Sequence, residues 1–283
     1  MNSMKHYKPT TPSQRNTTRV NYREELSGDK PHKALTGGFY RAWGRNHHGR
    51  ITTRHKGGGH KRRLRDIDFM YDKHDVVATI ETIEYDPNRS GFIGLALYQD
   101  GARRYVILPA TVKVGDTFIV SVEAPVKPGN RMMLKNMPLG TFVYNIEMKP
   151  NGGSKIARSA GNYAEVVAQD NGKTHLKMPS TEVRQVVGTA WACVGAVSND
   201  EHRLMHLGKA GRSRHLGIRP TVRGTAMNPV DHPHGGGEGK MGRGHRRARS
   251  MWGKPTGKGQ KSRRPKKYSN VFILNRRKVG KKS

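Results

Sequence analysis

The charge of this chain is concentrated at its two ends. Residues 1–60 carry 12 Lys and Arg against 3 Asp and Glu, and residues 201–283 carry 23 against 3, whereas residues 61–200 carry 18 against 15. Segments with such an excess of one charge repel themselves and do not become compact alone. Only 33% of the residues are hydrophobic. We therefore expect the middle of the chain to fold on its own core and the ends to be extensions.

A polyanion would neutralise the charged ends of a chain whose net charge is +32. Nucleic acid is the polyanion that a cytosolic protein meets most often, and Lys and Arg that bind its phosphates release counterions. A solvated tail that serves only solubility is the alternative, but charge this dense would bind polyanions even so. A membrane surface fits less well, because the basic segments are rich in Gly and Pro and lack an amphipathic stripe.

Several other classes are disfavoured by short features of the sequence. No run of apolar residues is long enough to span a membrane. Residues 1–10 lack the apolar core of a secretory signal, and Glu24, Glu25 and Asp29 argue against an organellar transit peptide. Cys193 is the single cysteine, which excludes an intramolecular disulfide and a multi-cysteine zinc site and fits a reducing cytosol.

Short β-strands are predicted from about residue 66 onward. They are rich in β-branched residues and are separated by turn signals such as Asp86-Pro87-Asn88 and Asp100-Gly101. The predicted strands cover residues 76–84, 91–98, 104–108 and 117–122. Strands of this length at this spacing predict a small antiparallel barrel.

A second set of strands follows a linker at residues 125–130. These strands are predicted over residues 141–148, 163–168, 174–178, 182–187 and 191–197. Each set is small for a free-standing domain, so we expect the two to pack against each other or against a partner. Outside them no period persists, although the apolar run at residues 271–274 could form one strand or an apolar anchor.

Residues 44–63 alternate glycine with Arg, Lys and His. Glycine lets the backbone approach a phosphate closely, and Arg binds phosphate with two hydrogen bonds and stacks on bases. This pattern suits a chain threaded between RNA strands; a disordered polybasic linker is the alternative. Gly57-Gly58-Gly59 is not a Walker loop, because no strand precedes it and no Gly-Lys-Ser/Thr ends it.

Residues 228–239 are rich in His, Gly and Pro. His232 and His234, with Asp231 and Glu238 nearby, could ligate a metal, and Asp231–His232 could be half of a hydrolytic triad. Both sites need a rigid scaffold and a third positioned group, which Gly and Pro flanks do not provide. We favour an ordered loop that packs against RNA, where imidazoles stack on bases and hydrogen-bond to phosphate or ribose.

Further basic stretches lie at residues 209–215, 219–223, 245–249 and 261–267. One such patch could be a nuclear-localisation signal, but four exceed what a sorting signal needs. Arg89 follows a predicted hairpin turn and Arg158 lies in a loop, so each could reach a nucleic-acid backbone or could be a solvated surface charge.

The apolar and aromatic residues outside these motifs are interpreted as packing residues. Trp43, Trp191 and Trp252 are placed in this class, and Cys193 is interpreted as a small buried hydrophobe.

Four segments resemble bacterial large-subunit ribosomal protein two: residues 44–63, 83–90, 208–223 and 222–239. The resemblance covers nearly the whole chain and is most specific at residues 227–239. It is loosest around residues 114–136, 163–180 and 241–251, and residues 245–250 depart from the family's pattern. It implies an all-β core in which an OB-fold barrel is followed by an SH3-like barrel, with long irregular basic N- and C-terminal extensions. The implied domains are residues 1–60 (N-terminal extension), 61–127 (OB-fold RNA-binding domain), 128–200 (SH3-like barrel) and 201–283 (C-terminal extension).

The resemblance also implies a function. The family's proteins are primary rRNA-binding constituents of the large ribosomal subunit that support subunit association, tRNA binding and the peptidyl transferase centre during translation. It implicates Arg89 and Arg158 in rRNA binding and connects His232 with peptidyl transfer. The expected partners are 23S rRNA, 16S rRNA at a subunit bridge, tRNA indirectly and other ribosomal proteins, with no membrane. The expected location is the cytoplasm, in the ribosome.

We predict RNA contacts from basic and His side chains, no metal ligands of the protein's own, and no cofactor, although Mg²⁺ could bridge through rRNA. The predicted RNA-binding residues are Arg45, Arg50, Arg54, Lys56, His60, Lys61, Arg62, Arg63, Arg89, Arg158, Lys209, Arg212, Arg214, Arg219, Arg223, His232, His234, Arg246 and Arg247. We expect no enzyme activity. The alternatives are peptidyl transfer with His232 as general base and a free nucleic-acid chaperone or DNA-compacting protein.

Overall fold

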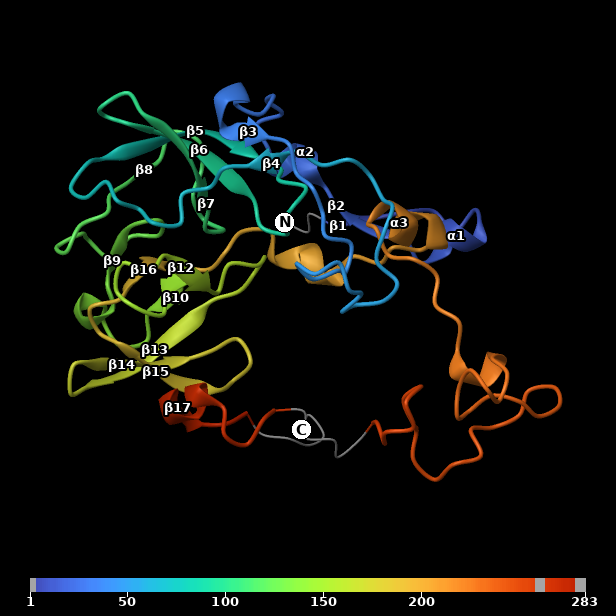
Figure 1. Cartoon of the computed structure of the whole chain (residues 1–283). Coiled ribbons are helices and arrows are strands. Elements are labelled where there is room, and N and C mark those ends of the chain that lie inside the picture. Colours follow the sequence, from blue (N-terminus) through green and yellow to red (C-terminus); the bar gives the residue numbers. More distant parts are fainter. Residues whose placement is uncertain (1–3, 258–262, 278–283) are drawn as a thin grey trace. The chain divides into compact units, whose positions relative to one another are not determined.

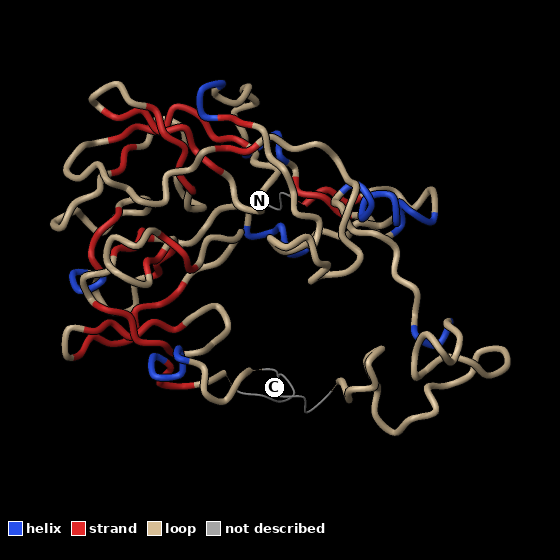
Figure 2. The backbone as a smooth tube through the Cα atoms, in the orientation of Figure 1, coloured by secondary structure: helices blue, strands red, loops and turns tan. Residues whose placement is uncertain are grey.

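The computed structural model describes residues 4–257 and 263–277, in two compact units. The β unit contains the described residues up to Arg41, Lys61–Lys209 and those from Val271 onward. The basic unit contains Ala42–His60 and Ala210–Asn270, ranges whose sequence has 20 Lys and Arg against 2 Asp and Glu. The described strands all belong to the β unit (Figure 2). The domain boundaries given above remain a prediction.

The first predicted set of strands forms a four-stranded antiparallel sheet in the order β7-β6-β5-β8 (Figure 1). Its strands are β5 (Ala78–Glu84), β6 (Ile93–Tyr98), β7 (Arg103–Ile107) and β8 (Thr117–Phe118). Along β5, Ala78 and Ile80 are buried and alternate with half-buried polar residues, which is the period-2 pattern of a half-buried strand. Asp86 closes the β5–β6 turn by accepting a hydrogen bond from the Asn88 amide at 2.8 Å.

The second set forms a seven-stranded sheet in the order β17-β15-β14-β13-β10-β16-β9. Its strands are β9 (Arg131–Met133), β10 (Phe142–Tyr144), β13 (Ala164–Asp170), β14 (Lys173–Lys177), β15 (Val183–Val187), β16 (Trp191–Val194) and β17 (Ile273–Asn275). The prediction of a strand at residues 271–274 is confirmed in part: the strand covers Ile273–Asn275, whereas Val271 and Phe272 end a 3₁₀ helix. The strand predicted over 141–148 is divided at Asn145, whose φ is 52°, and continues as β11 (Ile146–Glu147), which pairs with β12 (Ser154–Ile156).

Short elements interrupt the extensions that we predicted to be irregular. These are the strands β1 (Met4–His6), β2 (Thr18–Val20) and β3 (Thr36–Gly37), and the helices α1 (Pro12–Arg15), α2 (Tyr22–Glu25) and α3 (Ala210–His215). β3 pairs with β4 (Leu64–Arg65), which lies just beyond the N-terminal extension. Single 3₁₀ turns occupy Lys33–Leu35, Leu134–Asn136, Asp200–Leu204, Gly224–Ala226 and Tyr268–Phe272. In the part of the chain that the structure describes, no helix has the length and apolar character needed to cross a bilayer. The all-β class of the core is confirmed, and the two sheets are consistent with the expected pair of barrels.

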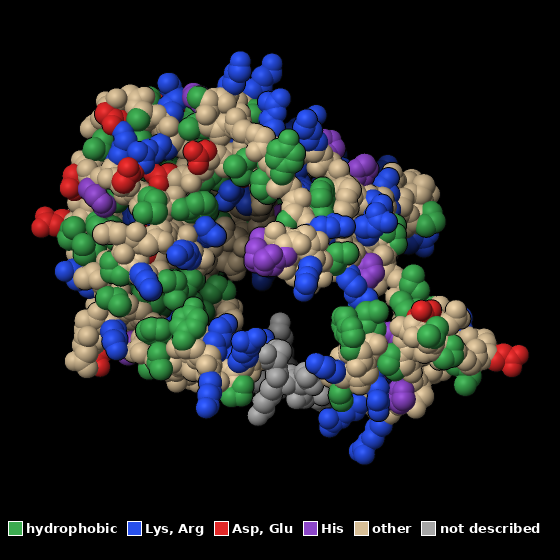
Figure 3. All heavy atoms as spheres, in the orientation of Figure 1, with side chains coloured by type: hydrophobic (Ala, Val, Ile, Leu, Met, Phe, Trp, Pro, Cys, Tyr) green, Lys and Arg blue, Asp and Glu red, His purple; other side chains and the backbone are tan. Residues whose placement is uncertain are grey.

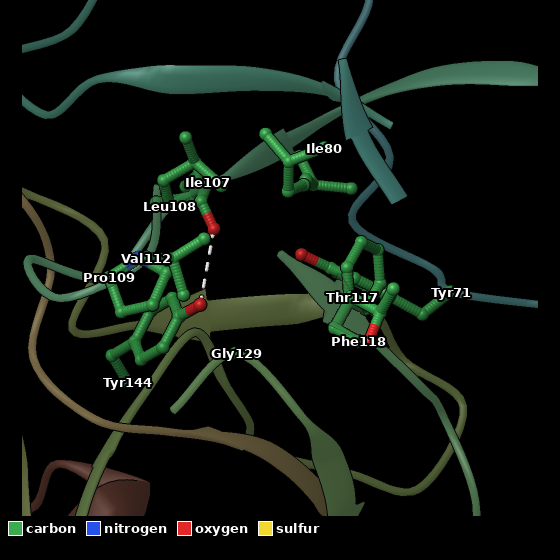
Figure 4. A pocket seen from close by; sticks show the side chains of 11 residues that line it. Tyr71, Ile80, Ile107, Leu108, Pro109, Val112, Thr117, Phe118, Gly129 and Tyr144 are labelled. Atoms are coloured by element: carbon green, nitrogen blue, oxygen red, sulfur yellow. Dashed lines mark hydrogen bonds between the residues drawn. The ribbon is translucent and has the colours of Figure 1, made fainter. Parts of the chain in front are cut away.

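The two sets of strands share one of the two buried apolar clusters, as expected from their small size, and this cluster is the shared core. The cluster around β5–β7 also contains Tyr144, Trp191 and Cys193 from the second set. The Tyr144 hydroxyl donates a hydrogen bond to the Ile107 carbonyl at 3.2 Å across this boundary (Figure 4). The cavity beside this bond measures about 10 Å³, which is room for one water at most. The interpretation of Trp191 and Cys193 as buried residues is confirmed.

A buried ion pair lies within this shared core. Arg131 Nη2 donates to Glu147 Oε1 at 2.9 Å, and both side chains are 1% exposed. Arg131 Nη1 also donates to the Asn145 carbonyl at 2.9 Å, and the guanidinium lies 4.6 Å from the Tyr71 ring centroid. No local pattern in the sequence signals this pair, because its members are 16 residues apart and neither lies in a recognisable motif.

Candidate RNA-binding surface

Arg89 and Arg158 lie against the same aromatic ring of the β unit. Their guanidinium carbons are 5.6 Å and 4.5 Å from the centroid of Phe69. Arg89 Nε donates to the buried Asp86 carboxylate at 2.5 Å, and Arg158 Nη1 donates to the Ser154 carbonyl at 3.2 Å. The tertiary structure therefore brings together two residues that the sequence analysis could only consider singly.

The charge of this arginine pair is only partly compensated. Burial, and then the positive charge of Arg89, lower the pKa of Arg158 below its ordinary value. An arginine nevertheless stays protonated, so the repulsion between the two guanidiniums persists. A phosphate between them would relieve it and could accept hydrogen bonds from both.

Arg62 and Arg63 are tied to the same β5–β6 turn. Arg62 Nη1 donates to the Pro87 carbonyl at 2.7 Å, and the Arg63 carbonyl accepts from Asn88 Nδ2 at 2.7 Å. The Arg63 side chain is exposed, whereas Arg62 is half-buried. Lys61 is exposed as well. These contacts place Arg62 and Arg63 beside the turn that holds Arg89, and Arg158 meets Arg89 at Phe69.

In the basic unit, the first glycine-rich motif pairs with the segment after α3. The Gly57 amide donates to the Gly217 carbonyl at 3.0 Å, the His60 amide to the His215 carbonyl at 2.9 Å, and the Arg219 amide to the His55 carbonyl at 3.0 Å. Lys56 and Ile218 form an antiparallel bridge. Two basic motifs that lie far apart in the sequence are thus joined by their backbones, which gathers Arg54, Lys56, Arg214 and Arg219 in one unit.

The glycines of this motif are needed where the two segments meet. A Cβ on Gly59 would lie 2.8 Å from both the His215 carbonyl oxygen and the Gly217 amide, and φ of Gly59 is +87°. Gly58, with φ +63°, has nothing within 4 Å of its Cβ position. Glycine is therefore needed at position 59 because other atoms lie too close for a Cβ. At position 58 glycine is favoured only by the left-handed backbone.

The histidine-rich loop is closed by its own hydrogen bonds. The His234 amide donates to His232 Nδ1 at 3.0 Å, and the Arg249 amide donates to His234 Nε2 at 2.9 Å. The His232 ring packs on Gly224, where a Cβ would lie 2.5 Å from Nδ1. The ring centroids of His232 and His234 are 4.7 Å apart. The expectation of an ordered loop here agrees with these contacts.

In the described ranges 4–257 and 263–277, no three His, Cys, Asp or Glu side chains are arranged so that they could hold a metal ion. Asp231 and Glu238 are both exposed. The imidazoles of His232 and His234 instead accept backbone hydrogen bonds.

Most of the other predicted side chains are exposed on their own unit. Exposed residues are Arg45, Arg50, Arg54, Lys56, His60, Lys209, Arg214, Arg219, Arg223, Arg246 and Arg247, and Arg212 is half-buried. On the face seen in Figure 3, acidic side chains gather over the sheet of β5–β8, where ion pairs such as Arg103–Glu81 and Arg104–Asp68 form. The predicted stretch at residues 261–267 begins with Lys261 and Ser262, which lie outside the described residues.

The sequence did not reveal two aromatic residues, Trp252 and Phe69, that lie beside predicted RNA-binding arginines. Trp252 is 72% exposed, so its interpretation as a packing residue is wrong. The Arg54 guanidinium lies 5.5 Å from its ring centroid. Phe69 supports the arginine pair but is separated in sequence from both arginines, so no local pattern signals it.

Family models match both halves of the chain. "Ribosomal Proteins L2, RNA binding N-terminal domain" matches residues 32–121, and "Ribosomal Proteins L2, C-terminal domain" matches residues 127–253. The chain belongs to the L2 family of ribosomal proteins. The resemblance found from its motifs is confirmed. The two members of the arginine pair come from different domains: Arg89 lies in the first L2 domain and Arg158 in the second.

Curated L2 relatives are similar over their full length. The large ribosomal subunit protein uL2 of Roseobacter denitrificans is 51% identical over 280 residues, 99% of each chain. That of Gluconobacter oxydans is 52% identical over 279 residues, 99% of this chain and 100% of its own. That of Granulibacter bethesdensis is 51% identical over 276 residues, 98% of this chain and 99% of its own.

Proposed function

We propose that the chain is a structural, rRNA-binding constituent of the large ribosomal subunit. One observation carries this proposal: the chain is 51–52% identical, over at least 99% of each chain, to proteins named large ribosomal subunit protein uL2. The RNA-binding description of the N-terminal family model supports it. The two groups of basic side chains, one at the β5–β6 turn and one in the basic unit, supply the charge that such a partner needs.

The finer assignments belong to the same proposal. The partners are 23S rRNA, 16S rRNA at a subunit bridge, other ribosomal proteins and, indirectly, tRNA. The protein acts in the cytoplasm, in the ribosome, where it supports subunit association, tRNA binding and the peptidyl transferase centre. The RNA contacts are those predicted from the sequence, with the arginine pair binding a phosphate and the basic unit following the RNA backbone. It has no cofactor of its own, and Mg²⁺ bridges through rRNA.

Peptidyl transfer is performed by the RNA in this proposal, and His232 is not its general base. A general base needs a lone pair within hydrogen-bond reach of the proton that it removes. In neutral His232 the Nδ1 lone pair accepts the His234 amide, and the proton is then assigned to Nε2. His232 is therefore suited to donate a hydrogen bond to RNA.

Sedimentation after a high-salt wash tests the proposal. We expect the tagged chain to remain with the large subunit at one copy per particle. A chain that leaves the particles in high salt, or that binds many RNAs weakly without a fixed ratio, would favour the nucleic-acid chaperone instead.

A further inference from the structure

The basic unit contains a groove of about 360 Å³. Its walls include Trp43, Ile51 and the cationic side chains of Arg45, Arg54, Lys56 and Arg219. We infer that this groove binds one unpaired nucleotide of RNA, with the base against Trp43 and the phosphate between the arginines. This inference rests on the proposed function and names the class of ligand that one site takes.

The walls of the groove are fixed by the backbone from two directions. The Gly44 carbonyl accepts hydrogen bonds from the amides of Thr52 at 2.8 Å and Thr53 at 3.0 Å. A bridge between Arg45 and Ile51 closes the same turn. The Arg219 amide donates to the His55 carbonyl at 3.0 Å, which brings the second wall from beyond α3. These contacts fix the shape of the groove in the folded basic unit.

Trp43 is held in an unusual backbone conformation. Its φ is 48°, and that of His55, on the opposite arm of the turn, is 59°. A bulky residue with positive φ is uncommon, and such residues cluster at functional sites where the surrounding structure imposes the conformation. Here the turn imposes it and directs Trp43 to the wall of the groove.

The chemistry of the groove fits a nucleotide better than a phosphate alone. Among the described residues that line the groove, four are Lys or Arg and none is acidic. These cations can bind the phosphate of a nucleotide. Trp43 and Ile51 add apolar surface, and Ile51 is 60% exposed. A base presents a flat face to tryptophan only when it is unpaired. The volume falls within the range of sites for small molecules.

A fluorescence titration of the full chain tests the inference. The probe is a single-stranded RNA octamer, and the comparison probe is the same octamer with an abasic central position; both carry a 5′-fluorescein, so that binding is followed by fluorescence anisotropy. We expect Trp43→Leu, which keeps an apolar side chain, to weaken binding of the base-bearing octamer by roughly 5- to 150-fold. It should leave binding of the abasic octamer unchanged. Trp43→Phe keeps a ring and should retain most of the difference between the probes.

Charge and aromatic controls complete the experiment. Arg219→Gln should weaken both octamers alike and lower the salt dependence by about one counterion. Tyr40→Leu is the matched control, because Tyr40 is a fully exposed aromatic outside the groove. An effect of Tyr40→Leu as large as that of Trp43→Leu would overturn the inference, as would equal binding of the two octamers by the wild-type chain.

Two further measurements separate this inference from the proposed function. If the wild-type chain binds rRNA from the large subunit but Trp43→Leu binds both octamers normally, the groove is refuted and the proposed function stands. If the wild-type chain does not bind rRNA, the proposed function fails. Displacement of the octamer by equimolar uridine monophosphate would identify a free nucleotide as the ligand and overturn the assignment to RNA.

Discussion

Arg89 and Arg158 lie against the same ring but differ in what holds each of them. Arg89 neutralises Asp86, whose side chain is completely buried, so removing Arg89 leaves a buried carboxylate without its cation. Arg158 donates to a carbonyl and contacts Phe69, so its removal leaves no buried acid behind. Substitution of Arg158 therefore reports on RNA binding with less disturbance of the fold.

We expect Arg158→Ala to weaken rRNA binding and to lower the slope of log affinity against log salt by about one, because one phosphate contact is lost. Arg89→Ala should lower the slope equally and also cost about 1–3 kcal/mol of stability. Titrations at several salt concentrations, with chemical denaturation, measure both effects. Arg103→Ala, which removes an exposed arginine paired with Glu81, is the control. Wild-type slopes in both variants would contradict RNA binding by the pair.

Arg131→Met is expected to destabilise the chain by about 3–5 kcal/mol, because it leaves the buried carboxylate of Glu147 without a partner. The double variant Arg131→Met/Glu147→Leu should recover much of this loss, since no buried charge remains. Arg103→Ala breaks an exposed pair and should cost less than about 1 kcal/mol. Urea denaturation measures all three, and equal losses for Arg131→Met and Arg103→Ala would refute the interpretation.

At the scale of elements, the Gly57–Gly59 segment and the residues after α3 depend on each other. Neither segment is a strand by itself, and each supplies the hydrogen-bond partners that the other lacks. Substitutions at neighbouring glycines can separate backbone strain from steric contact, because Gly58 and Gly59 both have positive φ but only Gly59 lies against other atoms.

Gly58→Ala should cost about 1–2 kcal/mol, the strain of a left-handed backbone. Gly59→Ala should cost more and should weaken RNA binding, because its Cβ would separate the two paired segments. Amide hydrogen exchange at Gly57, His60 and Arg219 measures the pairing directly. Equal protection of these amides in the two variants would show that the close contact at Gly59 does not control the pairing of the two segments.

The histidine-rich loop should loosen on acidification. Burial and the neighbouring charges of His232, His245, Arg243 and Arg249 lower the pKa of His234 below 6.5. A histidine with a lowered folded-state pKa contributes stability that is present at neutral pH and is lost as the pH falls below its unfolded value. Protonation of Nε2 also removes the acceptor for the Arg249 amide.

The protection of the Arg249 amide against hydrogen exchange should therefore fall between pH 7.5 and pH 5.5, after correction for the intrinsic exchange rate. The Thr256 amide, which donates to the Ala248 carbonyl at 2.7 Å, is the internal control and should change little. In His234→Ala the Arg249 amide should be unprotected at both pH values. A pH-independent Arg249 amide would contradict this role of His234.

At the scale of the whole molecule, the two units differ in whether they have a buried apolar core. Both buried apolar clusters consist of β-unit residues. In its described residues, the basic unit is held by backbone and side-chain hydrogen bonds and contributes nothing to those clusters. Hydrogen bonds alone contribute little net stability against the entropy of ordering a chain. An external polyanion is therefore expected to stabilise the basic unit.

Limited proteolysis of the free chain should cut first within residues 42–60 and 210–257 and leave residues 64–200 intact. Bound to rRNA, the same sites should be protected, since binding orders them. Mass spectrometry of the fragments identifies the sites. Equal resistance of the ends in both states would mean that the basic unit holds its conformation without RNA.

The sequence alone determined the segregation of charge, the positions of most strands and the family. Charge excess and β-branched runs such as residues 76–84 are local properties, so they can be interpreted without a fold. Arg89 and Arg158 were identified through the family resemblance, but whether each is solvated or held could not be told from neighbouring residues.

Only the tertiary structure decided which distant residues meet. It placed Phe69 against both arginines, Arg131 beside Glu147 in the shared core, and His60 beside His215. It also showed that Trp252 is exposed whereas Trp191 is buried. Such contacts depend on the path of the chain between the partners, and a local pattern contains no information about that path.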